Sequence, residues 1–109
     1  MEPQTQSLLQ ILSECVDACE HCATACLQED NVQMMARCIL LDRDCADVCA
    51  LTYRFVARGS EHAQHLMREC AEICHACVEE CAKHEADHCQ ACAEVCRRCA
   101  DACRQGLSA

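Results

Sequence analysis

Sixteen cysteines recur along the chain at intervals of three and four residues, a spacing that places them on one side of an α-helix. At ~100° per residue, each run falls within a narrow arc of the helix surface. A stripe of this period faces the axis when helices form a bundle, so we expect the cysteines to line a shared interior. The four runs are Cys15, Cys19, Cys22 and Cys26; Cys38, Cys45 and Cys49; Cys70, Cys74, Cys77 and Cys81; and Cys89, Cys92, Cys96, Cys99 and Cys103.

Few helix breakers interrupt these runs, because glycine occurs only at Gly59 and Gly106 and proline only at Pro3. We predict helices over residues 5–29, 32–57, 61–83 and 88–105, joined by short turns at 30–31, 58–60 and 84–87. Ser60 is a candidate N-cap, and Asp87 with Gln90 resembles a capping box. Short turns give antiparallel neighbours, so the predicted fold is all-α: one domain over 1–109, an up-down-up-down four-helix bundle with a Cys-lined core.

Cysteine at this density is typical of secreted chains held together by disulfides. However, the chain opens Met1-Glu2-Pro3 without the basic and apolar regions of a signal peptide, and no apolar run approaches the ~20 residues of a membrane span. We therefore expect a cytoplasmic protein with free thiols. The net charge of −9 argues against nucleic acid and acidic membranes as partners.

Packing alone does not explain the cysteines, since Leu would bury more apolar area at ~25 cal/mol per Å². Cysteines four residues apart on a helix have Cβ atoms ~5–6 Å apart, whereas a disulfide needs ~3.5–4.5 Å. Two metal–sulfur bonds of ~2.3 Å span roughly 4.6 Å, which such a pair can meet. The seven pairs are Cys15/Cys19, Cys22/Cys26, Cys45/Cys49, Cys70/Cys74, Cys77/Cys81, Cys92/Cys96 and Cys99/Cys103.

Copper(I) fits these pairs best, because thiolates select it and it does not demand four ligands. Zinc favours closed sites of four ligands, and iron–sulfur clusters are normally wrapped by loops. Three alternatives stay open: a ferredoxin-like iron–sulfur electron carrier, a disulfide-rich structural module, and a metallothionein-like store for zinc or cadmium as well as copper. Nothing in the sequence resembles a catalytic constellation, so we predict a binding protein and not an enzyme.

The segments Leu-Asp-Arg-Asp-Cys-Ala-Asp-Val-Cys-Ala at 41–50 and His-Cys-Gln-Ala-Cys-Ala at 88–93, with the cysteine ladder around them, resemble the bacterial copper storage proteins, specifically their cytosolic branch. The resemblance covers essentially the whole chain. It implies a four-helix bundle, a homotetramer and storage of many Cu(I) ions by core thiolates. Copper would be released to a competing thiol or to a partner such as a copper chaperone or effluxer.

The two ends of the predicted bundle differ. Met34 is in phase with Cys38, His84 is close to the phase of Cys81, and the topology places both beside His88, at an end that we call the mouth. There a thioether and imidazoles would take up copper, unless the three are ordinary core and turn residues. We call the opposite end the apolar end, defined by Leu8, Ile11, Leu12, Val56, Leu66 and Met67. The remaining histidines leave the stripes and are expected on the surface: His21, His62, His65 and His75.

Overall fold

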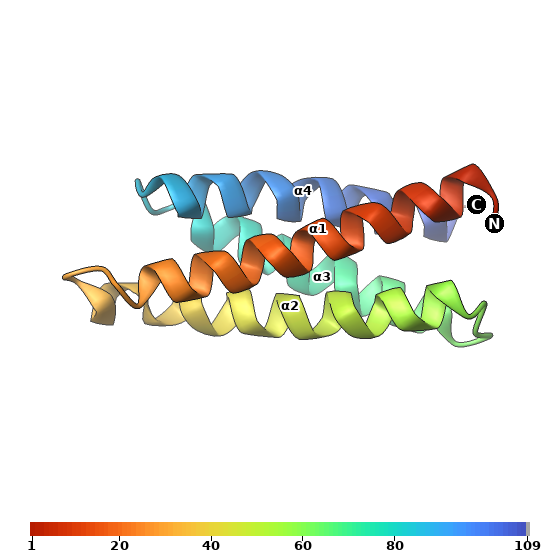
Figure 1. The fold of residues 1–109 in the computed structure, drawn as a ribbon, viewed down its shortest axis with the longest axis horizontal. Coiled ribbons are helices and arrows are strands. Elements are labelled where there is room, and N and C mark those ends of the chain that lie inside the picture. Colours follow the sequence, from red (N-terminus) through yellow and green to blue (C-terminus); the bar gives the residue numbers. More distant parts are fainter. Residues whose placement is uncertain (109) are drawn as a thin grey trace.

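The structure is a computed structural model that describes residues 1–108, and it contains four long helices joined by short turns (Figure 1). The helices are α1 (Pro3–Cys26), α2 (Ala36–Ala57), α3 (Ala63–Cys81) and α4 (Asp87–Ser108), and a short 3₁₀ helix, η1 (Val32–Met35), leads into α2. Successive helices run antiparallel, and α1 and α3 each pack against both α2 and α4. The predicted all-α, up-down-up-down bundle is confirmed. It measures 44 × 19 × 17 Å.

Local signals explain where the helices begin and end. Pro3 occupies the first turn of α1, where its missing N–H costs nothing. After α2, Gly59 adopts φ 66°, Gly59 N–H donates to Val56 O, and Ser60 N–H donates to Phe55 O. These two bonds form a Schellman motif, which requires a residue without steric cost at positive φ. The Ser60 hydroxyl then accepts a bond from His62 N–H in the turn before α3.

Some predicted boundaries were wrong by a few residues. The first helix ends at Cys26 and not at 29, because Gln28 and Glu29 donate to carbonyls three residues back and tighten the last turn. The second begins with η1, α3 spans 63–81, and α4 spans 87–108. In place of the predicted capping box, the Gln90 amide donates to Ala82 O and His84 O and ties the α3–α4 turn to α4.

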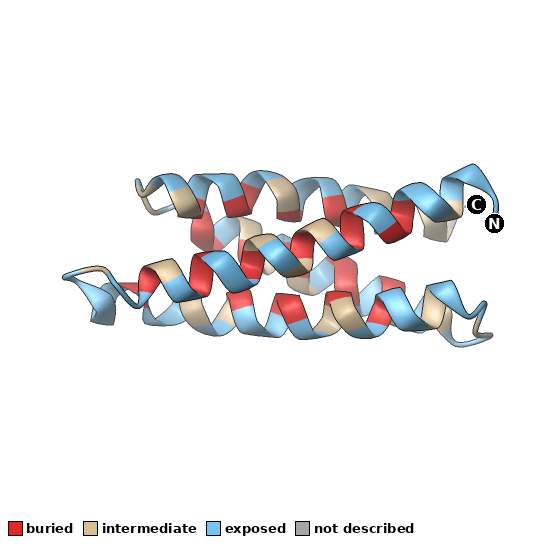
Figure 2. Ribbon diagram, viewed as in Figure 1, coloured by how far each residue is buried: buried red, intermediate tan, exposed pale blue. Residues whose placement is uncertain are grey.

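Buried positions follow one another along the inner sides of the helices (Figure 2), and most of them are cysteines. All sixteen cysteines are buried, and leucine, isoleucine and methionine side chains extend the core at the apolar end. Buried polar or charged side chains are few in the described chain: Asp42, Thr52 and Glu80. Among residues 1–108, no helix combines the length and the apolar character needed to cross a bilayer.

Candidate metal centre

The four helices bring their sulfur atoms within contact of one another. The Sγ atoms of Cys38 and Cys81 lie 3.3 Å apart across α2 and α3, and those of Cys19 and Cys96 lie 3.5 Å apart across α1 and α4. A disulfide bond is ~2.05 Å long, and all sixteen cysteines are free thiols in the structure. The stripe of each helix therefore faces the bundle axis, as its period predicts.

The intrahelical pairs have the separation that a two-coordinate ion can use. Five of the seven predicted pairs have Sγ atoms between 3.8 and 4.0 Å apart. Linear coordination with ~2.3 Å bonds needs about 4.6 Å, and a bent arrangement needs less. A small rotamer adjustment thus separates the metal-free geometry from a coordinated one.

Groups of four ligand atoms, all within 4.8 Å of one another, follow each other along the axis. Each group shares at least one cysteine with the next, so the groups form a continuous ladder and not a set of isolated sites. Shared thiolates can bridge two ions. From the mouth inward the groups include Cys22, Cys26, Cys38 and Cys89; Cys22, Asp42, Cys81 and Cys92; Cys19, Cys77, Cys92 and Cys96; Cys15, Cys19, Cys45 and Cys96; and Cys15, Cys49, Cys74 and Cys99.

Asp42 occupies the place where the cysteine run of α2 skips a step. Its Oδ1 accepts hydrogen bonds from Cys77 Sγ at 3.2 Å, Cys92 Sγ at 3.3 Å and Cys81 Sγ at 3.4 Å. Asp42 was not predicted from the sequence, although it lies four residues after Cys38 and therefore in phase with the stripe. The only oxygen in the ladder of groups above is thus a carboxylate near the mouth.

Burial is the largest cause of three raised pKa values near the mouth. It raises the pKa of Asp42 to about 8, with the neighbouring Cys92 and Cys38 adding to the effect when they are charged. Burial also raises the pKa of the Cys26 thiol to about 11 and that of Cys89 above its ordinary value. These mouth thiols are therefore protonated at neutral pH without metal, and coordination of a metal must release protons.

The residues predicted to form the mouth differ in their burial. His84 and His88 are mostly buried beside the first sulfur group. Within residues 1–108, His88 Nε2 has no hydrogen-bond partner, although Glu29 Oε1 lies 3.5 Å away. The expectation that Met34 shares the cysteine face is wrong: Met34 is 73% exposed, and Met35 is buried instead. The cause is η1, since a 3₁₀ helix turns ~120° per residue and shifts the phase of the segment before α2.

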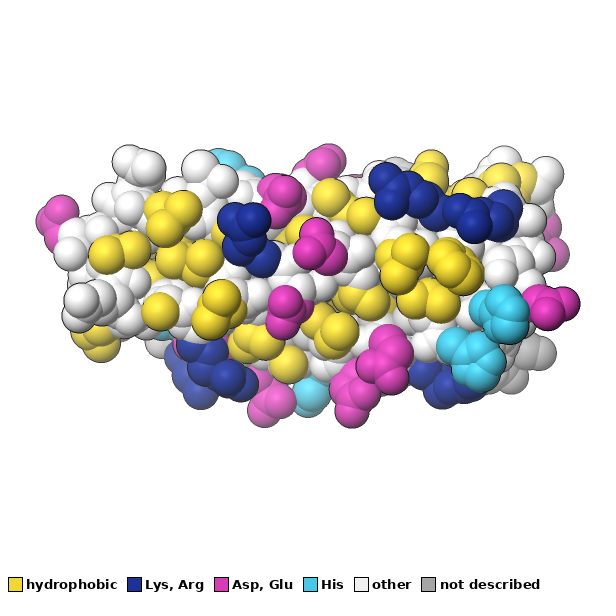
Figure 3. Space-filling view, turned by 90° about the horizontal axis from the view of Figure 1, so that it is seen from below, with side chains coloured by type: hydrophobic (Ala, Val, Ile, Leu, Met, Phe, Trp, Pro, Cys, Tyr) yellow, Lys and Arg dark blue, Asp and Glu magenta, His cyan; other side chains and the backbone are white. Residues whose placement is uncertain are grey.

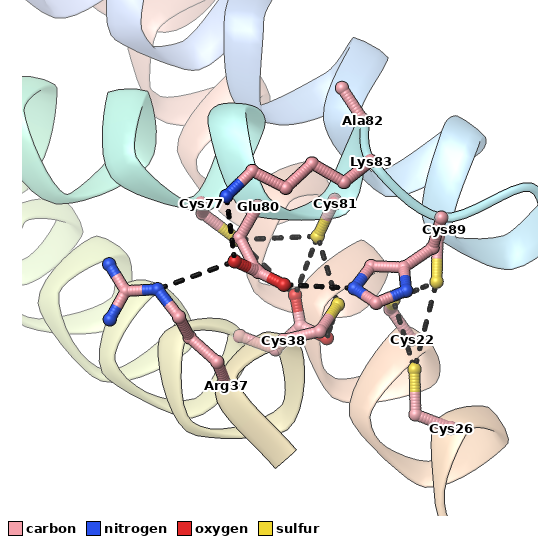
Figure 4. A network of polar contacts seen from close by, with 12 residues as sticks. Cys22, Cys26, Arg37, Cys38, Cys77, Glu80, Cys81, Ala82, Lys83 and Cys89 are labelled. Carbon is pink, nitrogen blue, oxygen red and sulfur yellow. Dashed lines mark hydrogen bonds and ion pairs between the residues drawn. The ribbon is translucent and has the colours of Figure 1, made fainter. Parts of the chain in front are cut away.

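A network around Glu80 borders the mouth (Figure 4). Its Oε2 lies 2.9 Å from His84 Nε2, and its Oε1 lies 3.3 Å from Arg37 Nε and 3.5 Å from Lys83 Nζ. In the figure, Arg37 and Lys83 reach the carboxylate of Glu80 from one side, and the sulfurs of the first group lie on the other. Glu80 was not predicted from the sequence, because its partners come from α2 and from the turn after α3.

The apolar end has a different lining. Leu8, Ile11, Leu12 and Met67 are buried there, and Val56 is half-buried against them. Thr52 is the polar side chain of this region, and its hydroxyl donates to Leu66 O. The four histidines expected on the surface are exposed.

Comparison with known proteins identifies the family of this chain. The family model described as copper storage protein matches residues 1–108. The chain belongs to the copper storage protein family. The resemblance drawn from the sequence is thereby confirmed.

Relatives of the family share both sequence and fold with this chain. The uncharacterized cysteine-rich protein YhjQ of Bacillus subtilis is 43% identical over 91 residues, 84% of each chain. A Cu(I)-bound copper storage protein, BsCsp3, has a TM-score of 0.90 at 42% identity, covering 94% of this chain and 96% of its own. A cytosolic copper storage protein from Streptomyces lividans, with five coppers, has a TM-score of 0.94 at 37% identity, covering 97% and 93%.

Proposed function

We propose that this chain stores Cu(I) in the cytoplasm, holding multiple ions on the sixteen cysteine thiolates of its core. The observation that carries the proposal is the ladder of overlapping sulfur groups, in which neighbouring sites share ligands. Membership of the copper storage family and the copper held by its solved relatives support the same function. The chain acts as a binding protein of one domain, and its cargo is the metal.

The shared ligands favour copper over the alternative metals. A closed zinc site uses four ligands of its own, so a ladder that shares thiolates supplies few such sites. Cu(I) accepts fewer ligands and tolerates bridging thiolates, so the same sulfurs hold more ions. Sixteen thiolates used in unshared pairs hold eight ions, and bridging raises this number.

Copper enters at the mouth in this proposal. His84 and His88 offer ring nitrogens beside the group formed by Cys22, Cys26, Cys38 and Cys89. From there an ion moves inward along groups that share cysteines, always within reach of a further sulfur. Met34 is no longer part of the proposed site, since its side chain faces solvent. Release requires a competing thiol or a partner such as a copper chaperone or effluxer.

The assembly that we propose is a homotetramer. Leu40, Leu51 and Tyr53 are exposed on α2, and Figure 3 shows hydrophobic side chains distributed over this side of the bundle among acidic and basic ones. Such side chains are suited to contacts between copies of the chain. Light scattering of the purified protein measures the assembly directly.

An anaerobic titration tests the storage function. Reduced protein is titrated with Cu(I) in the presence of a chromogenic Cu(I) chelator, and a parallel titration uses Zn(II) with a zinc chelator. We expect saturation at eight or more Cu(I) per chain, fewer Zn(II), and proton release during loading. Saturation at one or two Cu(I) contradicts storage, and a preference for Zn(II) at equal capacity favours a general store of soft metals.

A further inference from the structure

Glu80 is a buried charged side chain that has no role in copper storage by thiolates. It is only 7% exposed, although glutamate is among the residues least often buried. Burying a carboxylate is costly unless charged or hydrogen-bonding groups compensate for lost water. The groups that contact Glu80 therefore indicate its role.

The two oxygens of Glu80 have different neighbours. Oε1 faces Arg37 and Lys83, both largely exposed cations, whereas Oε2 faces the mostly buried imidazole of His84. Two cations flank the carboxylate, and a carboxylate offers only acceptors of hydrogen bonds. The 2.9 Å contact therefore requires a hydrogen on His84 Nε2.

Fixing the hydrogen on Nε2 decides which atom of His84 can bind a metal. In a neutral imidazole only one nitrogen carries hydrogen, so Nδ1 keeps the free lone pair. Histidines that bind metals commonly donate their other N–H to a carboxylate, which orients the ring and makes it more basic. Glu80 itself is a poor ligand for Cu(I), because a soft ion prefers sulfur and nitrogen to carboxylate oxygen.

We propose that Glu80 is a positioning residue for copper uptake: it holds His84 by the Nε2 hydrogen and presents Nδ1 to the incoming ion. The proposal rests on the proposed function, in which His84 is a ligand of the mouth. Glu80 acts through the imidazole and does not contact the ion.

The same helix contains a matched control. His75 Nε2 lies 3.2 Å from Glu79 Oε1, with the same separation of four residues, but these side chains are 56% and 68% exposed. This pair has the local chemistry of Glu80 and His84 without the burial and without the mouth. Glu79→Ala should therefore leave copper uptake unchanged.

Nitrogen NMR reads the tautomer without any copper. The reduced, metal-free protein is labelled with ¹⁵N-histidine and studied at about pH 8, where imidazole is neutral. We expect His84 to carry hydrogen on Nε2 in the wild type and to become a mixture of tautomers in Glu80→Ala. Glu80→Gln keeps an oxygen that accepts the N–H and should restore part of the preference. An unchanged tautomer in Glu80→Ala overturns the proposal.

Stopped-flow transfer of Cu(I) from a chelator tests the consequence for uptake. We expect Glu80→Ala and His84→Ala each to slow transfer about ten-fold, at the low end of the 10–100-fold effects of such supporting residues on metal affinity. The double variant should be no slower than His84→Ala alone, and saturation should not change. Circular dichroism verifies that each variant is folded, and Glu80→Leu, which fills a similar volume without an acceptor, substitutes for Glu80→Ala if the latter is not.

The outcomes separate the two proposals. The positioning role is overturned if Glu80→Ala takes up Cu(I) at the wild-type rate, or if it slows transfer further when combined with His84→Ala. Either result leaves the storage function intact. Wild-type transfer by His84→Ala removes both His84 and Glu80 from uptake. If the wild-type titration saturates at only one or two Cu(I), storage itself is contradicted, whatever the NMR result.

Discussion

The two ends of the bundle share a backbone architecture but differ in what faces the axis. Asp42, His84 and Glu80 with its partners lie at the mouth, whereas Leu12 and Met67 fill the interior at the apolar end. The same helical period positions both sets. The helical period thus decides which residues face the interior, while the residue type at each position decides whether that position offers a ligand to a soft metal ion.

The largest expected effect concerns the apolar end. Leu12 is fully buried, so Leu12→Ala should lower the free energy of unfolding by about 3–5 kcal/mol, through lost apolar burial and the cavity left behind. Urea denaturation of the reduced, metal-free protein measures this. Cu(I) capacity, titrated at low temperature where the variant is folded, should stay constant. A reduced capacity would mean that the apolar end takes part in storage.

The second prediction concerns Asp42 and pH. Its folded-state pKa of about 8 exceeds the ordinary ~3.9, so between these values the folded protein holds a proton that the unfolded chain has lost. The stabilisation from this group is complete below pH ~4 and is lost as pH rises through about 8. Between these pH values the free energy of unfolding of the wild type should fall by about 1–3 kcal/mol relative to that of Asp42→Asn. The pKa difference alone would give a larger fall, but water that reaches the ionised group reduces it. Chemical denaturation of both metal-free proteins across this range measures it; parallel curves would contradict the shift.

A third prediction sharpens the assignment of the mouth. Replacing His84 and His88 together with Ala should slow Cu(I) transfer about ten-fold or more, because two ring nitrogens beside the first sulfur group are lost. The final stoichiometry should not change, since the sixteen thiolates remain. Met34→Leu is the control, and its transfer rate should equal that of the wild type because Met34 faces solvent. Equal rates in all three proteins would show that copper enters elsewhere.

The smallest effect is expected at Gly106, also at the apolar end. A Cβ added there would press on Met67 Cε, the far end of a flexible side chain that can move aside. Gly→Ala in a helix gains ~0.5–1 kcal/mol, which offsets the cost of that movement. Thermal denaturation of Gly106→Ala should therefore differ from the wild type by no more than about 0.5 kcal/mol in stability. A large loss would show that this end is packed too rigidly for side chains to adjust.

Much of the fold followed from local pattern. The cysteine stripe and the scarcity of breakers predicted four helices and their inward faces, and the short turns predicted their antiparallel order. Asp42 was missed although its phase was visible, because a carboxylate is rarely expected in a core. Met34 was misplaced because residues 32–35 form a 3₁₀ helix, to which the α-helical period does not apply.

The sequence by itself determined that the chain forms helices with sulfur on one face and that this face suits a soft metal ion. Only the tertiary structure decided which sulfurs meet across helices, such as Cys38 with Cys81, and that Arg37 of α2 reaches Glu80 of α3. The physical reason is that periodicity fixes the direction of a side chain about its own helix axis. Contacts between helices depend also on their relative rotation and axial offset, which the packing of all four sets together.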